Sequence, residues 1–393
     1  MIEIKGQYAD ANIMVPNESD LEQYARAQIQ MICDFEANDC NEIVIMPDVH
    51  PGKIGPIGLV MRINSGRIMP GLIGPDIGCG MTVIKLDKFR KDFDKLDNTI
   101  EKYIVPKATE RNISPMLLEE AKWYYETMYC YPNLKSKEKF INCIGSLGGG
   151  NHFIEIGVDE DEQYYLTIHS GSRLLGFILY EHYMKSGQEA LKKEGIEVPY
   201  EMTYLTGDLA EEYLCDIAMV TRFAKYNRLG IADIIFKQCK KSISAKYYDG
   251  INQNIMDAID VPHNYVEERH NNKPGILRKG AIAAYHDQDV VIPANMKDGI
   301  ILGKGKGNPN WLASAPHGSG RLYSRLDVAN HYTVNQFKKD MDKIHCSNIG
   351  KDTLSESPCA YRSIDYLKEA IKDTVNIEHI IKPVYNYKSG DEK

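Results

Sequence analysis

Six side chains at predicted turns are the ones most able to bind a metal ion or to act as a nucleophile. Asp76 and Cys79 lie three residues apart, and four histidines lie beside small residues in other turns: His152, His169, His263 and His317. A mixed set of nitrogen, oxygen and sulfur donors is typical of a transition-metal site, whereas structural zinc more often uses closely spaced cysteine pairs. Taken singly, Cys79 is more often a small buried residue, and each histidine is more often structural. Together they predict a metal centre.

Phosphate chemistry is compatible with this set. A thiolate can bridge two cations, and two cations can polarise a phosphate from both sides. Arg173, Arg321 and Arg325 all follow glycine-rich turns, and arginine forks bind phosphate oxygens. Arg321 and Arg325 share one face if this segment opens a helix, although pairing with surface carboxylates fits the fragment equally well. The run 303–307 (GKGKG) lacks the Walker spacing, which excludes a P-loop nucleotide site.

Short strands and intervening helices must position these turns. Apolar β-branched runs predict strands over 42–46 and 81–86, each bordering a glycine-rich loop. Three- and four-residue apolar spacing predicts helices over 209–226, 117–128 and 363–372, the first opened by a capping box of Asp208 and Glu211. Because the turns are spread from residue 48 to residue 321, we expect one large α+β domain over 1–388 with mixed sheets around a central cleft, and a flexible tail over 389–393.

Composition limits the class of protein. The chain has 393 residues, 43% hydrophobic and 26% charged, which is typical of a globular protein. Forty-seven Lys plus Arg against fifty-five Asp plus Glu give a net charge of -8, so any nucleic-acid site must be a local basic patch. Nine scattered cysteines without a C-x-x-C pair favour reduced thiols in a cytoplasm. No secretory leader or apolar run long enough to span a membrane is present, so we expect a cytoplasmic protein without a membrane partner.

Six motifs resemble the RtcB family of RNA ligases, in the same order and over most of the chain. They are PDVHPGKIGPIG, GPDIGCGM, GGGNHFIEI, HSGSR, PHN and SAPHGSGRLYSR. The resemblance implies an RtcB-type fold with a metal and nucleotide cleft. It also implies an enzyme that uses GTP and two Mn²⁺ ions to join RNA ending in a 3′-phosphate or 2′,3′-cyclic phosphate to RNA beginning with a 5′-hydroxyl, in tRNA splicing or RNA repair.

The resemblance also implies a role for particular residues. Asp76, Cys79 and His152 would bind one Mn²⁺, and Cys79, His169 and His263 the other, while His317 would accept GMP. The GTP site would comprise Asn151, Phe153, Glu155, Asn264, Pro293, Ala294, Asn295, Met296, Gly318, Ser319, Gly320 and Lys388. Glu155 would read guanine, and the RNA phosphates would be held by Asn151, Arg173, Arg321 and Arg325. The chain departs from the family at Ala294-Asn295-Met296, where many members have Gly-Ser-Met, and at Ser319, where alanine is common.

Other functions share part of this machinery. A metal-dependent phosphoesterase that opens cyclic phosphates would use the same metal ligands and arginines, but it would not guanylylate His317. A protein that only binds RNA ends would leave His317 without a purpose. The ligand set admits Zn²⁺ and Co²⁺ beside Mn²⁺. The sequence alone determines neither the physiological RNA, nor a requirement for an activating protein partner, nor the oligomeric state.

Overall fold

Two β-sheets carry most of the extended backbone of the computed structural model, which describes residues 2–105, 113–245, 258–267 and 275–390. The six-stranded sheet has the order β1 (Ile2–Lys5), β2 (Asp10–Ile13), β3 (Glu42–His50), β4 (Ile57–Arg62), β12 (Ile276–Lys279) and β11 (Asn264–Val266). It is mixed, because β2 and β3 are parallel while the other neighbours are antiparallel.

The seven-stranded sheet is antiparallel throughout. Its order is β10 (Ile259–Pro262), β5 (Gly80–Leu86), β8 (Tyr164–Ser170), β7 (Phe153–Val158), β17 (Val375–Lys388), β15 (Gly299–Gly305) and β14 (Asp289–Asn295). Two small pairs complete the strands: β13 (Ala281–Ala283) with β16 (Ser314–Pro316), and β6 (Lys88–Phe89) with β9 (Ile243–Ser244).

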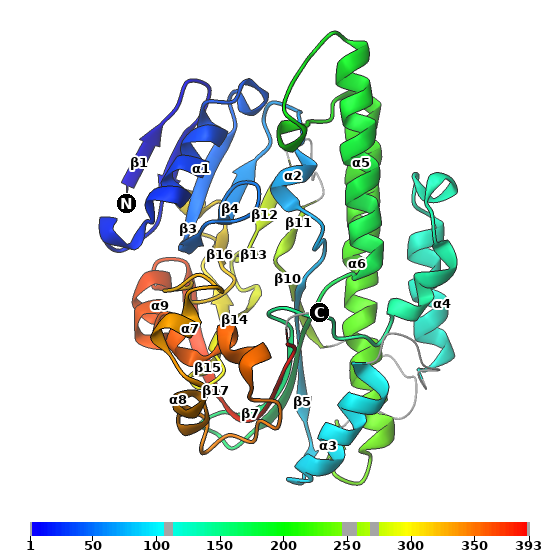
Figure 1. The fold of residues 1–393 in the computed structure, drawn as a ribbon, viewed down its shortest axis with the longest axis vertical. Helices are drawn as coiled ribbons and strands as arrows, with labels where there is room; N and C mark the ends of the chain where they lie inside the picture. Colours follow the sequence, from blue (N-terminus) through cyan, green and yellow to red (C-terminus); the bar gives the residue numbers. More distant parts are fainter. Residues whose placement is uncertain (1, 106–112, 246–257, 268–274, 391–393) are drawn as a thin grey trace.

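Two long helices, α5 (Leu174–Lys193) and α6 (Gly207–Gln238), run side by side along one flank of the molecule (Figure 1). α4 (Pro115–Glu126) packs on α6, and α3 (Phe93–Thr99) lies near the far end of α6. The other helices are shorter: α1 (Gln23–Cys33), α2 (Pro70–Ile73), α7 (Val328–His331), α8 (Val334–Asp340) and α9 (Ile364–Ile371). Among the described residues, no helix is both long and apolar enough to cross a bilayer.

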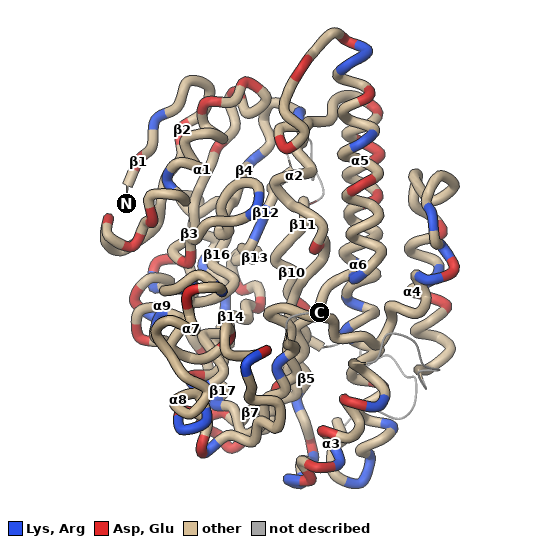
Figure 2. Tube along the Cα trace, in the orientation of Figure 1, with Lys and Arg blue, Asp and Glu red and all other residues tan. Residues whose placement is uncertain are grey.

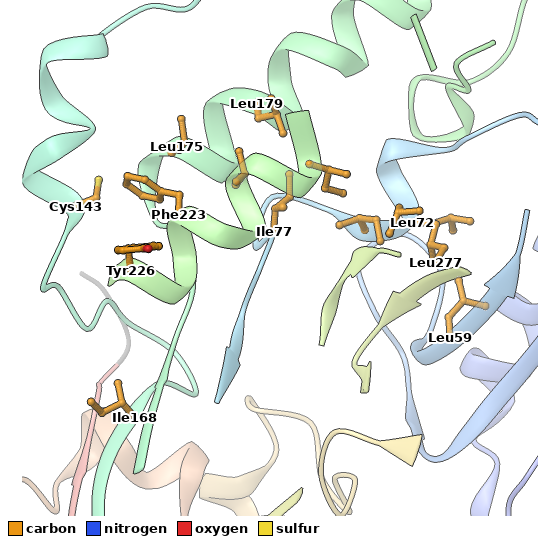
Figure 3. Close-up of a cluster of buried hydrophobic side chains, with 14 of the residues drawn as sticks. Leu59, Leu72, Ile77, Cys143, Ile168, Leu175, Leu179, Phe223, Tyr226 and Leu277 are labelled. Carbon is orange, nitrogen blue, oxygen red and sulfur yellow. The ribbon is translucent and has the colours of Figure 1, made fainter. Parts of the chain in front are cut away.

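The largest hydrophobic core joins the long helices to the sheets. Leu175 and Leu179 of α5 lie near Phe223 of α6 and Ile77 of the turn before β5 (Figure 3). All four are fully buried. The turn that carries Asp76 and Cys79 is therefore fixed by packing against the helices. Acidic and basic residues are interleaved along α5 and around α3 instead of segregating by sign (Figure 2).

The α+β fold predicted from sequence is confirmed, with corrections at the ends of elements. The helix expected over 209–226 spans Gly207–Gln238. Thr206 holds its N-cap position without a side-chain capping bond, so the predicted box of Asp208 and Glu211 does not form its start. The strand expected over 42–46 continues to His50, because Pro47–Val49 is also buried. Residues 321–325 precede α7 and are not helical. The flexible tail is predicted to start at Ser389, but Ser389 is buried and its N–H donates to the carbonyl of His152 (2.8 Å). Residues 391–393 lie outside the described residues.

Candidate functional site

Four neighbouring strands of the seven-stranded sheet bring the predicted metal ligands to one edge. Gly80 of β5 pairs with Pro262 of β10, so the following residue, His263, lies beside Cys79, and its N–H donates to the Cys79 carbonyl (2.8 Å). His169 of β8 pairs with Met81 on one side and with Phe153, next to His152, on the other. Residues far apart in the chain thus share one end of adjacent strands.

The donor atoms of these ligands converge on two points that share Cys79. The Cys79 Sγ lies 3.4 Å from the His152 Nε2 and 3.3 Å from the His169 Nε2. The His169 Nε2 lies 3.3 Å from the His263 Nε2, and the Asp76 Oδ2 lies 3.8 Å from the His152 Nε2. Cys79, His169 and His263 form one group, and Asp76, Cys79 and His152 form the other; within each, all donor atoms lie within 4.8 Å of one another.

The protonation state of these groups suits a cation. Burial lowers the pKa of His169 and of His263 well below the usual value, so both imidazoles are neutral at pH 7. Burial opposes ionisation of Asp76, but its hydrogen bond and charge interaction with His152 prevail and lower the pKa to about 2. Burial raises the pKa of the Cys79 thiol, and a bound metal ion is the usual means of ionising such a thiol. The residues present therefore fit a pair of transition-metal ions bridged by a thiolate.

Second contacts orient the first histidine. The His152 Nδ1 lies 2.8 Å from the carbonyl of Leu147, to which it donates, and this bond turns Nε2 toward Cys79. This arrangement is usual for metal-bound histidine, whose other ring nitrogen is held by a protein acceptor.

His317 lies directly beside this metal-ligand cluster. It follows β16, and its ring centroid is 4.8 Å from that of His263. Its Nδ1 lies 2.7 Å from the Oδ2 of Asp48, a fully buried carboxylate near the end of β3. Because the carboxylate accepts a hydrogen bond from the Nδ1–H, the lone pair of the neutral ring is left on Nε2. This is the geometry of an oriented nucleophile or base.

A cavity of about 400 Å³ extends from His317 and His169. It is lined by nearly all of the residues that sequence analysis assigns to the nucleotide: Asn151, Phe153, Glu155, Pro293, Ala294, Asn295, Met296, Gly318, Ser319, Gly320 and Lys388. Asn264 instead lines a neighbouring cavity of about 290 Å³, together with Asp76 and His263. There its side chain accepts from the N–H of Gly280 (2.8 Å) and donates to the Asp76 carbonyl (3.2 Å), which braces the metal-ligand turn.

Glu155 gives the cavity an unusual carboxyl group. One oxygen accepts a hydrogen bond from the amide of Asn386 (2.8 Å), and the other, Oε1, is buried with no hydrogen-bond partner among the described residues. Burial raises the pKa of Glu155 to about 8, although the Asn386 bond and the charge of Lys388 oppose the shift. The Lys388 ammonium lies over the Phe153 ring, 4.9 Å from its centroid. Polar and aromatic groups are thus preset for a planar, hydrogen-bonding ligand.

A second buried carboxylate, Glu356, forms ion pairs with three basic side chains of the cavity. It lies 2.6 Å from Arg325, 3.4 Å from Arg321 and 3.0 Å from the Lys388 Nζ. Burial opposes its ionisation, but the charges of Lys388, Arg325 and Arg321 prevail and lower its pKa. Both arginines therefore do pair with a carboxylate, although a buried one instead of a surface one.

Arg173 and the two positions that depart from the family motifs also have defined contacts. Arg173 lies at the start of α5, and its guanidinium occupies the space beside Gly148, where a Cβ atom would lie 1.9 Å from it. The two departures from the family motifs contact each other, because the Ser319 hydroxyl donates to the carbonyl of Ala294 (2.8 Å). Ala294 lies in strand β14, a conformation that an alanine adopts without strain.

Three residues of the site were not singled out from the sequence. Asp48 lies within the motif PDVHPGKIGPIG, but only the fold brings it to His317. Asn386 is two residues before Lys388 in β17, so strand alternation places both on one face and could have identified it. Glu356, in a 3₁₀ turn over Lys351–Glu356, carries no local signal.

Comparison with known proteins agrees with this architecture. A family model described as tRNA-splicing ligase RtcB matches residues 36–389. The RNA-splicing ligase RtcB of Escherichia coli K12 is 28% identical, over 94% of each chain. Proteins named tRNA-splicing ligase RtcB from Methanococcus maripaludis and Pyrobaculum aerophilum are 27% and 25% identical, over 84% and 83% of each chain. The chain belongs to the RtcB family.

Proposed function

We propose that the protein is an RNA ligase acting in tRNA splicing or RNA repair. It joins a 3′-phosphate or 2′,3′-cyclic phosphate end to a 5′-hydroxyl end, with GTP as the source of activation and two Mn²⁺ ions as cofactors. The observation that carries this proposal is the position of His317, which lies between the metal-ligand cluster and the 400 Å³ cavity with its Nδ1 held by Asp48. A site that only opened cyclic phosphates would not need an oriented imidazole beside a nucleotide-sized cavity.

The two ligand groups would each hold one ion. Asp76, Cys79 and His152 form the first set, and Cys79, His169 and His263 the second. When bound, such ions neutralise charge on the reacting phosphate and on the departing pyrophosphate. His317 lies against this second set through its ring contact with His263, so the α-phosphate of a nucleotide in the cavity would lie near both the nucleophile and the residues that would hold the ion.

The base of GTP would lie at the end of the cavity that contains Glu155. The unpartnered Oε1 of Glu155 can accept hydrogen bonds from the N1–H and the amino group of guanine. Adenine has no N1–H and cannot donate in the same pattern. Phe153 and Lys388 line the same wall. Discrimination against adenine follows, because that base would leave the buried carboxyl oxygen without a partner.

Guanylylation would begin at the His317 Nε2. This atom attacks the α-phosphorus of GTP, a nitrogen–phosphorus bond forms, and the bond to the pyrophosphate oxygen breaks. The Nδ1 proton stays on the ring and donates to the Asp48 carboxylate, whose charge stabilises the ring as it becomes positive. The product on His317 is a phosphoramidate, which is reactive enough to pass GMP onward.

Any cyclic phosphate on the RNA would first be opened by water to a 3′-phosphate, as the first step of the reaction. An oxygen of this phosphate displaces His317 from GMP, which gives an RNA end carrying a good leaving group. The 5′-hydroxyl then attacks the RNA phosphorus, and GMP leaves with the bridging oxygen. Asn151, Arg173, Arg321 and Arg325 would hold the RNA phosphates. Of the two arginines that pair with Glu356, Arg325 is 40% exposed, whereas Arg321 also bonds to Ser355 and Tyr361.

The test is to incubate the protein and its His317→Ala variant with α-labelled GTP and Mn²⁺ and to measure label on denatured protein. Acid-labile, alkali-stable label on the unmodified protein alone supports a histidine–GMP step. Absence of label in a protein shown to hold its metals, together with hydrolysis of cyclic-phosphate RNA, would favour the phosphoesterase.

A further inference from the structure

A buried arginine on the long helix α6 contacts the backbone of the metal-ligand turns. Arg228 is fully buried, and its Nη1 donates to the carbonyl of Gly78 (2.9 Å) and to the carbonyl of Ser170 (2.8 Å). Its Nε lies 3.0 Å from the Thr82 hydroxyl and 2.9 Å from Asp260, and its Nη2 lies 2.9 Å from the second Asp260 oxygen. All three guanidinium nitrogens are therefore bonded to the segments that carry the ligands.

Each partner of Arg228 is close in sequence to a predicted ligand. Gly78 directly precedes Cys79, Ser170 directly follows His169, and Asp260 is three residues before His263. These segments come from three different strand ends that the sheet brings together. One guanidinium thus links the backbone beside Cys79 to the backbone beside His169, and also to the side chain of Asp260 on the strand that leads to His263.

The preceding residue performs the same task for the first ligand set. The Asn227 side chain accepts from the N–H of Ser146 (3.0 Å) and donates to its carbonyl (3.0 Å), and it also donates to the Ser170 hydroxyl (3.1 Å) and the Gly171 carbonyl (2.9 Å). Ser146 adjoins Leu147, whose carbonyl holds the His152 Nδ1. Asn227 and Arg228 together therefore reach the segments around His152, Cys79, His169 and His263.

The turn around Cys79 is also pressed directly onto α6. Gly78 has a φ of +70°, and a Cβ atom there would lie 2.8 Å from the Thr221 Cα and 2.9 Å from the Ala224 Cβ. Because there is no room for a side chain at Gly78, the backbone of the turn lies directly against α6 at this point. A planar fork with five donors can serve several carbonyls at once, which a lysine ammonium in the same place cannot.

A buried charge of this kind needs a reason, because a well-packed apolar group of similar volume would cost less to bury. Asp260 balances the charge, but balance alone does not explain two further bonds to carbonyls that flank ligands. We propose that Arg228, assisted by Asn227, is a positioning residue that holds the ligand-bearing turns at the spacing needed for two bridged metal ions. This inference rests on the proposed metal-dependent function.

The test compares metal binding by Arg228→Lys with that by a matched variant of the same helix. Asp216 of α6 is also charged and fully buried, and it accepts from the N–H groups of Tyr129 (2.6 Å) and Cys130 (3.0 Å) and from the Tyr183 hydroxyl (2.7 Å). Its partners lie away from the metal-ligand turns. Asp216→Asn therefore disturbs a buried network on α6 without touching the site.

Titration with Co²⁺ gives readouts that do not depend on RNA-joining activity. They are the number of ions bound, their affinity, and the thiolate-to-metal absorption band that reports Cys79. We expect Arg228→Lys to bind Co²⁺ about 10- to 100-fold more weakly at one or both sites, with a reduced thiolate band. Asp216→Asn should lower the thermal midpoint but keep the affinity and the band. Unchanged binding of two ions by Arg228→Lys would overturn the inference.

Two further results separate the possible failures. If the unmodified protein binds no metal ion, the proposed metal-dependent function fails, and the positioning role fails with it. If Arg228→Lys does not fold, as judged by circular dichroism, Asn227→Ala replaces it in the same titration. Weakened binding by Asn227→Ala supports the positioning role, and affinity equal to that of the unmodified protein overturns it.

Discussion

Replacement of Asp48 by asparagine tests the assignment of His317 most directly. The substitution preserves shape at a fully buried position and removes only the charge that faces the His317 Nδ1 at 2.7 Å. With asparagine, the ring loses the carboxylate that fixes its tautomer and stabilises its positive charge. We therefore expect Asp48→Asn to fold and to bind metal, but to transfer GMP slowly.

The magnitude follows from two limits. If the new amide oxygen still accepts from Nδ1, the loss is that of a charge-assisted hydrogen bond, about 1.5–3 kcal/mol, which is roughly a 10- to 150-fold lower rate at about 1.4 kcal/mol per tenfold. If the amide instead donates to Nδ1, the ring adopts the wrong tautomer, for which the loss is about 10⁴-fold in a serine-protease triad. The rate of labelling should therefore fall at least about tenfold.

The assay is single-turnover labelling of the protein with α-labelled GTP at saturating Mn²⁺. A matched control is available at a second histidine–aspartate pair outside the site, where the His345 Nε2 lies 2.8 Å from the Asp97 Oδ2. Asp97→Asn should label at the rate of the unmodified protein. The assignment of Asp48 would be refuted by an Asp48→Asn variant that labels within about twofold of the unmodified protein.

Four other outcomes are expected. Because burial raises the pKa of Glu155 to about 8 and guanine needs its carboxylate form, GTP affinity measured by calorimetry should rise between pH 7 and pH 9. Without nucleotide, Glu155 is protonated in the folded protein up to about pH 8 but only up to about pH 4.5 in the unfolded chain, so its contribution to stability is lost as the pH rises from 4.5 to 8. Glu155→Gln lacks this loss and should unfold at a higher temperature than the unmodified protein at pH 9. The same variant should bind GTP weakly at every pH. Glu356→Gln, which removes the charge that balances buried Lys388 and Arg321, should lower the free energy of unfolding in urea by about 3–5 kcal/mol. Asp365→Asn, at an exposed pair with Lys368, should change it by less than about 1 kcal/mol. Mn²⁺ at about 100 times its dissociation constant should stabilise the unmodified protein by about 2.7 kcal/mol, and Cys79→Ala should lose much of this increment in a thermal melt.

The donor groups of the site could be predicted from the sequence, because each has a recognisable local setting. Asp76 and Cys79 share one glycine-rich turn, and His152, His169, His263 and His317 each lie beside small residues that leave the ring accessible at a turn. Strands β3 and β5 were also predictable, since their residues form short apolar runs. Local spacing predicted the helices but not their ends. α6 continues twelve residues past Tyr226, to Gln238. This part was missed because Tyr226–Phe236 is buried on all sides and therefore shows no amphipathic stripe.

Tertiary structure decided which residues meet. Asp48 and His317 are 269 positions apart, and only the packing of the strand pair β13 and β16 beside β3 brings them to hydrogen-bonding distance. Glu356 pairs with Arg325 and Lys388 across loops that have no local signal for it. Arg228 reads as an ordinary polar residue of a helix until the fold buries it among three strand ends. Local sequence thus determined which donors and turns are present, whereas long-range contacts, which depend on the register and packing of the sheets, decided how they are oriented and charged.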